Sequence, residues 1–429
     1  MESKNKKIGL WEAVAMAVGT MIGASIFSIF GVGAKIAGNN LPEAFILSGL
    51  FALLVAYSYS KLGSKIISNA GPIAFILKGI GDNLVTGALS ILMWLSYVVS
   101  ISLFAKGFAG YFLPLAHIKI SAFSIGLTEA VLIALFTAIS TFGSKAVGKS
   151  EFYIVLVKLS ILGFFILLGF LTINSNYIVP SFSSTKLQST LSAAVVFFLS
   201  YMGFGLITNA SENMEKPEKN VPRAIFISIA VVMFVYVAVS LVAIGNLSIP
   251  DLIKAEENAL AVASKPFLGS FGFILISIGA LFSISSALNA TLYGGANIAY
   301  SLAKDGELPD VFERKVWFKS PEGLYITAAL GLFFALTFNI GSIATITSAI
   351  YTIIYIFVLI SHYRLADKYG GNKSFILFSI IILLVVFIAL LHYQWQTQRN
   401  AFYGTIITLI GALILEYLYR LIKKREFAK

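Results

Sequence analysis

Cysteine is absent from the 429 residues of the sequence, which excludes disulfide bonds, thiolate metal sites and cysteine redox motifs. Charged residues are scarce at 12% of the chain, and histidine occurs only at His117, His362 and His392. Each histidine lies near the predicted end of an apolar segment. A buried histidine relay or metal centre is therefore not expected, and no metal or other cofactor is predicted.

Carboxylates are nearly missing from the apolar segments as well. Glu12, Glu129 and Glu416 are the acidic residues within them, each within about two turns of an end, and Glu416 can pair with Arg420 four residues later. A membrane enzyme such as an acyl- or prenyltransferase needs a deep acid, a histidine pair or an acidic metal cluster. Because the sequence offers none of these, an enzyme is not expected.

Hydrophobic residues, in contrast, make up 58% of the chain, and the mean hydropathy is +0.89. A bilayer core of ~30 Å needs ~20 apolar residues per helical span. The sequence therefore predicts an all-α integral membrane protein with twelve transmembrane helices and no soluble domain. The predicted segments are 11–37, 41–68, 82–113, 124–142, 149–173, 189–211, 221–245, 270–303, 324–340, 343–364, 373–392 and 400–424.

The net charge of +11 could suggest a nucleic-acid partner, but its distribution favours a membrane topology signal. Lysine and arginine gather at the tails and at alternate loops, which is the pattern of cytoplasmic segments. We therefore expect a multi-pass protein of the cell (plasma) membrane with both termini cytoplasmic, surrounded by lipid, and no nucleic-acid partner. The basic clusters include Lys6 and Lys7, Lys145 and Lys149, Lys216, Lys219 and Arg223, and Lys423, Lys424 and Arg425.

The first apolar segment contains small residues where a membrane helix would usually carry leucine, isoleucine or valine. Gly19, Gly23, Ala24 and Ser25 occur within one or two turns, which weakens a helix and uncovers its backbone. Uncovered backbone at membrane depth is tolerated only where it is buried in protein or lines a polar cavity. The sequence predicts that this helix is broken near Gly23.

The sixth segment repeats this feature, because Gly203, Phe204 and Gly205 also fall at its middle. Two glycine-interrupted segments at corresponding places indicate a transporter built from inverted repeats with a site at the midplane. The expected repeats are 11–173 and 189–364, followed by two additional helices in 373–424. Close helix packing is the alternative role of such glycines, and Phe204 either contacts the substrate or packs in the core.

A pair of broken helices has a specific chemistry. A half-helix that begins after Gly23 presents free N–H groups and a positive dipole end, which suit a carboxylate. A half-helix that ends near Tyr201 and Met202 presents unpaired carbonyl groups, which suit an ammonium group. Together these ends predict a site for the carboxylate and the amine of an amino acid.

Two lysines, Lys106 and Lys158, lie within apolar segments. Lys106 is close enough to a segment end for its side chain to reach the interface, so a structural role is expected. Lys158 lies about 13 Å from its end, where a lysine costs on the order of 3 kcal/mol. Because burial disfavours the charged ammonium, Lys158 either carries a proton or serves as a fixed cation that ties helices together.

Three motifs in order give the chain a resemblance to a known family. They are the stretch GTMIGASIF in the first segment, the loop from Glu212 through Pro217 to Ile225, and the stretch from Ala303 to Pro309. The chain resembles, over nearly its whole length, the amino acid–polyamine–organocation transporter superfamily. The resemblance implies a LeuT-like fold, with a ten-helix core of two inverted five-helix repeats, broken helices 1 and 6, and two extra C-terminal helices.

The resemblance also implies two groups of site residues. The substrate would be held by the backbone of the two broken helices, at Ile22, Gly23, Ala24 and Ser25 and at Met202, Gly203, Phe204 and Gly205. In proton-coupled members a lysine ammonium replaces the sodium ion of other members, and Lys158 matches it. Its expected neighbours are the carbonyls of Gly19 and Ile22, with the hydroxyls of Ser283 and Ser286. Many members have glycine where this sequence has Ser25, which changes how a carboxylate approaches.

These observations predict a sodium-independent, proton-coupled symporter of amino acids with broad specificity. An amino-acid exchanger, in which Lys158 is a fixed cation, is the alternative. A channel is disfavoured because broken helices that are not repeated in a ring suit an occluded site better than an open pore. The segment from Asn246 to Gly269 is expected to form short surface helices. The oligomeric state does not follow from the sequence.

Overall fold

The computed structural model describes residues 7–68, 70–141, 147–181, 183–304, 308–316 and 320–423. Within these ranges the regular elements are helices, and the β-structure consists of two isolated bridges, Ile8 with Met214 and Lys315 with Pro321. The prediction of an all-α protein is confirmed.

The first half of the chain forms the following helices: α1 (Leu10–Ser28), α2 (Phe30–Ala37), η1 (Gly38–Asn40), α3 (Leu41–Gly63), α4 (Pro72–Ile80), α5 (Leu84–Leu115), α6 (Ala122–Thr141), α7 (Val147–Phe170), η3 (Ser175–Tyr177), α8 (Ser184–Phe197), η4 (Phe198–Phe204), α9 (Gly205–Asn209) and η5 (Ser211–Asn213). The second half forms α10 (Pro217–Asn246), α11 (Ile249–Lys254), η6 (Glu256–Asn258), α12 (Ala259–Ala263), α13 (Lys265–Lys304), η7 (Asp310–Phe312), α14 (Glu322–Thr337), α15 (Ile340–Tyr369), α16 (Lys373–Thr397) and α17 (Arg399–Lys423).

Eleven helical segments of the described chain are long and apolar enough to cross a membrane. Each predicted segment coincides with one helix or with a run of consecutive helices, as α8, η4 and α9 do for the sixth segment. Helix α14, which matches the ninth predicted segment, is not among the eleven, because its 16 residues give only about 24 Å. Helix α4, which has nine residues, lies between α3 and α5 and was not predicted from the hydropathy pattern.

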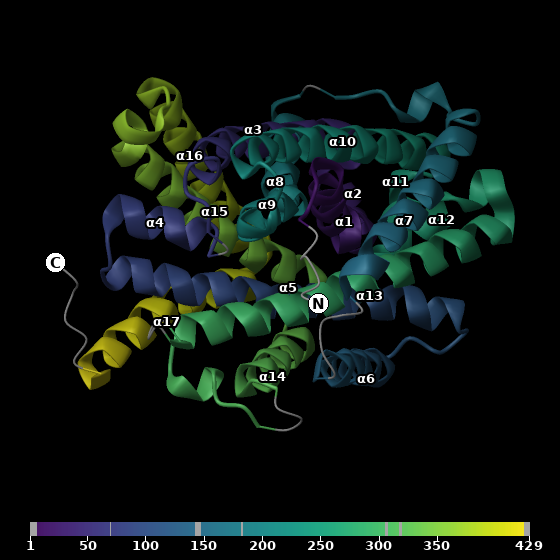
Figure 1. The fold of residues 1–429 in the computed structure, drawn as a ribbon. Coiled ribbons are helices and arrows are strands. Elements are labelled where there is room, and N and C mark those ends of the chain that lie inside the picture. The colour runs from purple at the N-terminus through teal and green to yellow at the C-terminus, as the bar shows by residue number, and fades with distance from the viewer. Residues whose placement is uncertain are drawn as a thin grey trace.

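The helices enclose α1 rather than lying beside it. Figure 1 shows α1 and α2 near the middle of the molecule, with α3 and α10 on one side and α5 and α13 on the other. Helix α1 packs against α5, α7, α10 and α13, and its residues Ala13, Ala17 and Ile22 are fully buried. A helix with so little lipid contact is positioned to carry a site.

The predicted break in the first segment is displaced from Gly23, Ala24 and Ser25. Helix α1 continues through all three residues to Ser28, and the interruption occurs at Ile29, where φ is −112° and ψ is 8°. Gly23 serves close packing of α1 on α13 instead. A Cβ at this position would lie 2.9 Å from the Cβ of Ala287. The predicted position of the break was therefore wrong, although the segment is divided into two helices.

The predicted interruption of the α-helix in the sixth segment is confirmed, but it begins earlier, at Phe198. Helix α8 ends at Phe197, and the seven residues of η4 form a 3₁₀ helix before α9 begins at Gly205. Stretches of 3₁₀ helix longer than three or four residues are uncommon and often mark a functional hinge. The irregular backbone therefore includes Met202, Gly203 and Phe204.

The segment between α10 and α13 forms α11, η6 and α12, which confirms the short helices expected between Asn246 and Gly269, but their expected surface position was wrong for α12, in which Ala259, Leu260, Ala261 and Ala263 are fully buried. Gly269 has φ of 60°, so the long helix α13 is kinked near its start. The loop motif that begins at Glu212 is held by the N-terminal segment, because Ile8 N–H donates to the carbonyl of Asn213 at 2.8 Å. In the motif from Ala303 to Pro309, residues 305–307 lie outside the described residues.

Helix α17 is joined to the start of α5 by a buried ion network. The guanidinium of Arg420 donates to Glu416 and to Asp82, each at 2.5 Å, and to the carbonyl of Asn83 at 3.1 Å. Glu416 is fully buried and Arg420 is 7% exposed. The expected pairing of Glu416 with Arg420 is confirmed, and Asp82 extends it to a second helix.

We expect Arg420→Gln to lower the stability of the protein, because it leaves two carboxylates without their counter-charge. Breaking a buried pair costs about 3–5 kcal/mol. The check is the apparent melting temperature of the protein in detergent micelles. Lys373→Gln is the matched control, since its pair with Asp367 is solvent-exposed on both sides and exposed pairs contribute about 0–1 kcal/mol. Equal melting temperatures for the two variants would contradict a stabilising role of the network.

Candidate substrate and coupling site

Lys158 of α7 points into the protein and contacts α1. Its side chain is 2% exposed, and Nζ donates a hydrogen bond to the carbonyl of Gly19 at 2.5 Å. A lysine at this depth needs polar partners, because an unpaired ammonium is costly away from water. The predicted contact between Lys158 and the Gly19 carbonyl is present.

The hydroxyl of Ser283 on α13 binds the same face of α1, one turn further along. Ser283 Oγ donates to the carbonyl of Gly23 at 2.6 Å and approaches the carbonyl of Ile22 at 3.5 Å. Ser286 lies on α13 three residues later and is 9% exposed. Residues of α7 and α13 therefore supply the polar partners of the α1 backbone at Gly19, Ile22 and Gly23.

Helix α1 also touches the irregular backbone of η4. A Cβ at Gly203 would lie 2.9 Å from the backbone nitrogen of Met21 and 3.1 Å from the carbonyl oxygen of Ala17. A real Cβ does not come so close to backbone without a shift of one segment. Gly203 is therefore required for the contact between η4 and α1.

A cavity of about 100 Å³ lies next to this contact. Its lining comes from α1, α3, α4, α5, η4, α9, α13 and α15, and includes the hydroxyl groups of Thr20, Ser25, Tyr97 and Tyr351. None of the described residues that line it is Asp, Glu, Lys, Arg or His. The lining therefore suits a solute of no net charge that is bound by hydroxyl groups and backbone.

The predicted substrate residues divide between this cavity and its surroundings. Ser25, Met202, Gly203 and Gly205 line the cavity. Ile22 is fully buried, Gly23 is buried against Ala287, and Ala24 lies between Gly23 and Ser25 in α1. Three of the four residues predicted in the sixth segment therefore line the cavity, whereas α1 contributes Ser25 together with Thr20 and Met21, which were not predicted.

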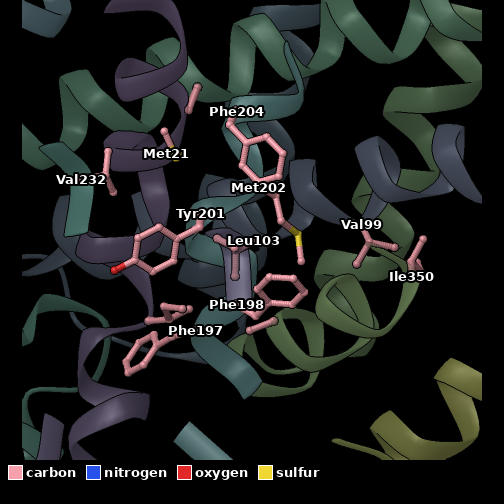
Figure 2. Close-up of a cluster of buried hydrophobic side chains, with 14 of the residues drawn as sticks. Met21, Val99, Leu103, Phe197, Phe198, Tyr201, Met202, Phe204, Val232 and Ile350 are labelled. Atoms are coloured by element: carbon pink, nitrogen blue, oxygen red, sulfur yellow. The ribbon is translucent and has the colours of Figure 1, made fainter. Parts of the chain in front are cut away.

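Phe204 packs in the core rather than over the cavity. Its ring meets those of Tyr59 and Tyr355, with centroids 5.2 Å and 5.7 Å away. Figure 2 shows Phe198, Tyr201 and Met202 of η4 in the same cluster of buried side chains, which also contains Met21 and Leu103. Of the two roles considered for Phe204, packing is the one observed.

Sequence reasoning missed Tyr236 of α10, which joins α1 to η4. Tyr236 is fully buried, and its hydroxyl lies 2.5 Å from the carbonyl of Met21, 3.1 Å from the carbonyl of Ser200 and 3.0 Å from Ser25 Oγ. Because a tyrosine has one hydroxyl proton, Tyr236 can donate to only one of the two carbonyls at a time. A tyrosine in an apolar helix gives no sequence signal of such a role, since most pack in the core.

We expect Tyr236→Phe to raise the half-saturating substrate concentration for uptake about tenfold, because the change removes the hydroxyl that joins the Met21 carbonyl of α1 to the Ser200 carbonyl of η4, although Ser25 Oγ still donates to Met21. Tyr201→Phe is the matched control. It removes an equally buried hydroxyl from the neighbouring ring, but one that donates to Phe45 of α3 at 2.8 Å. Equal effects on half-saturation would show that Tyr236 acts through general stability.

Lys106, the other lysine in an apolar helix, forms an ion pair inside the protein. Its Nζ pairs with Glu129 of α6 at 3.1 Å, and their side chains are 16% and 1% exposed. The expected structural role of Lys106 stands, but its physical basis is an ion pair rather than an extended side chain at the interface. The partner lies on another helix, so spacing along the chain could not identify it.

The fold and the site together define a helical membrane protein with a small buried cavity between two interrupted helices. The model of the amino acid permease family matches residues 8–418, and the chain belongs to this family. It is 68% identical to an uncharacterized protein of Methanocaldococcus jannaschii, over 100% of this chain and 98% of the relative.

Two further relatives are each 30% identical to this chain. The inner membrane transport protein YbaT of Escherichia coli matches over 98% of this chain and 97% of its own length. The methylthioribose transporter of Bacillus subtilis matches over 84% of this chain and 82% of its own length. Members of this family are transporters, so the prediction that the chain is not an enzyme is confirmed.

Proposed function

We propose that this permease is a secondary active transporter that imports amino acids together with protons, independently of sodium and with broad specificity. It would lie in the cell membrane with both termini in the cytoplasm. The motifs of the chain resemble in particular those of the proton-coupled amino-acid transporter ApcT. The observation that carries the proposal is the buried ammonium of Lys158 on the Gly19 carbonyl, beside the cavity-lining helix α1.

The uncharged lining of the cavity supports an amino acid as the solute. An amino acid in its zwitterionic form has no net charge, and its carboxylate and ammonium can be bound by helix ends and backbone groups. At about 100 Å³ the cavity holds only a few water molecules, so a larger amino acid requires the surrounding helices to move apart.

Lys158 supports proton coupling through its position between helices. When protonated, the ammonium holds α7 to α1 at Gly19, while Ser283 holds α13 to α1 at Gly23. Loss of the proton removes the charge-assisted bond to Gly19, which is about twice as strong as a neutral one. The helices α1 and α7 can then separate, which couples proton release to a conformational change.

An amino-acid exchanger is the second candidate, because a lysine that is 2% exposed and bonded to a carbonyl also suits a fixed cation. The test is uptake of labelled amino acids into sodium-free proteoliposomes with and without an inward proton gradient. Accumulation that follows the gradient and disappears with an uncoupler is the expected result. Exchange against internal substrate, with no response to the gradient, would replace symport by the exchanger.

A further inference from the structure

The short helix η6 is inserted between α2 and α5 at a place where each carries a glycine. A Cβ at Gly31 of α2 would lie 2.2 Å from the carbonyl oxygen of Glu256, and a Cβ at Gly110 of α5 would lie 2.3 Å from the Cβ of Glu257. Glu256 itself has a φ of 50°, which is uncommon for a residue with a side chain. The backbone of η6 is therefore held tightly against both helices.

Lys106 and Glu129 form an ion pair one helical turn from Gly110, where Glu257 of η6 contacts α5. Lys106 lies one turn before Gly110 on α5, and it pairs with Glu129 of α6 at 3.1 Å. The charges of Lys106 and Glu129 both act on the carboxyl of Glu257. Glu129 is fully buried, and its Oε2 atom has no hydrogen-bond partner among the described residues. The cluster therefore has two carboxyl groups for one ammonium.

The remaining titratable groups around Glu257 do not remove this imbalance. Glu256 adds a further acid next to it, and Tyr111 of α5 uses its hydroxyl to donate to the carbonyl of Phe27. Lys35 of α2 and His392 of α16 face a cavity of about 780 Å³ that Glu256 and Glu257 also line. This larger cavity shares no lining residue with the smaller one beside η4, so the protein separates the two.

We propose that Glu257, Lys106 and Glu129 form a proton-binding site that keeps η6 seated between α2 and α5, and that release of this proton allows η6 to leave. With one proton bound, the three groups carry no net charge. Without it, two carboxylates share a single ammonium in a half-buried place, and the repulsion favours movement of Glu257 toward water.

The direction of the pH effect follows from the pKa of Glu257. Burial is the largest cause that raises this pKa above its ordinary value of 4.5, and the carboxylates of Glu256 and Glu129 raise it further, while a backbone hydrogen bond to the Glu257 carboxyl and the charge of Lys106 oppose the rise. A carboxyl exposed to water would keep an ordinary pKa. The seated state therefore binds the proton more tightly, and it becomes less stable relative to the unseated state as the pH rises above 4.5.

The absence of native cysteine allows a direct test with single cysteines. Ser192→Cys places a thiol in the larger cavity, and Lys119→Cys places one in an exposed loop as a reference for the thiol chemistry. The rate of alkylation of the full-length protein in detergent micelles is measured for both between about pH 5 and about pH 8. The rate at Ser192→Cys divided by that at Lys119→Cys should rise several-fold with pH.

Glu257→Gln in the Ser192→Cys background should give a low rate ratio at every pH, because the amide mimics the protonated acid. Glu256→Gln removes the adjacent carboxylate but leaves the titrating acid in place, so it should reduce the rise without abolishing it. Glu129→Gln removes a carboxylate that raises the pKa of Glu257 and frees Lys106 to pair with Glu257, so it should weaken the rise and make it level off at a lower pH. A full rise in the Glu257→Gln protein, or no rise with native Glu257, would overturn the proposal. The test needs no substrate, so its outcome is independent of the proposed transport function.

Discussion

Replacing Lys158 by alanine should abolish accumulation of amino acids driven by a proton gradient, while exchange of internal for external substrate continues. For coupling of one proton to one substrate, a gradient of one pH unit supports about a tenfold concentration ratio. The native protein should approach this ratio, and Lys158→Ala should stay near equality. The physical reason is that the ammonium of Lys158 bonds the Gly19 carbonyl of α1, and alanine removes that group.

Lys158→Arg distinguishes a proton carrier from a fixed cation. Arginine keeps its positive charge at all accessible pH values, so it can hold α1 but cannot give up a proton. If Lys158 is a carrier, the arginine variant should also fail to accumulate substrate. Accumulation by Lys158→Arg at the native level would show that a permanent charge is sufficient at this position and that Lys158 is not the proton carrier.

Gly203→Ala should reduce the rate of uptake at least tenfold, and Gly203→Val should abolish it. The added Cβ would meet the backbone of Met21 at 2.9 Å, so η4 and α1 must separate at the edge of the cavity. Inserting a methyl group into a well-packed contact costs about 1–3 kcal/mol. Initial rates of labelled uptake, normalised to the amount of folded protein, measure the effect.

Gly163→Ala is the control for this substitution, because a Cβ at Gly163 of α7 meets no atom within 4 Å. It changes helix propensity by the same residue exchange but leaves packing unaltered. Uptake by Gly163→Ala should remain close to native. A similar loss of uptake in the two variants would mean that the contact between η4 and α1 is not needed for transport.

The sequence allowed the fold class and Lys158 to be predicted because both depend on strong local signals. Long apolar runs require membrane helices, and a lysine near the middle of one stands out by its cost. Its contact with Gly19 followed from the family resemblance, since nothing in the spacing between residues 19 and 158 brings them together.

Other features could not be predicted because they depend on how helices are rotated against one another. The break in the first segment lies at Ile29 rather than at Gly23, because Gly23 fits against Ala287 and its carbonyl is bonded by Ser283. Tyr236 joins α1 and η4 only because α10 places its hydroxyl beside the carbonyls of Met21 and Ser200. A glycine in the sequence marks where close approach is allowed, and the neighbouring helix decides whether it becomes a break or a contact.

Proton movement driven by substrate is the most direct test of proton coupling. Proteoliposomes containing a pH indicator are prepared in sodium-free buffer with equal pH on both sides, and an amino acid that the protein takes up is added outside. Symport requires the lumen to become more acidic as labelled substrate enters, and Lys158→Ala liposomes should show no acidification. Entry of substrate into native liposomes at constant internal pH would contradict proton coupling.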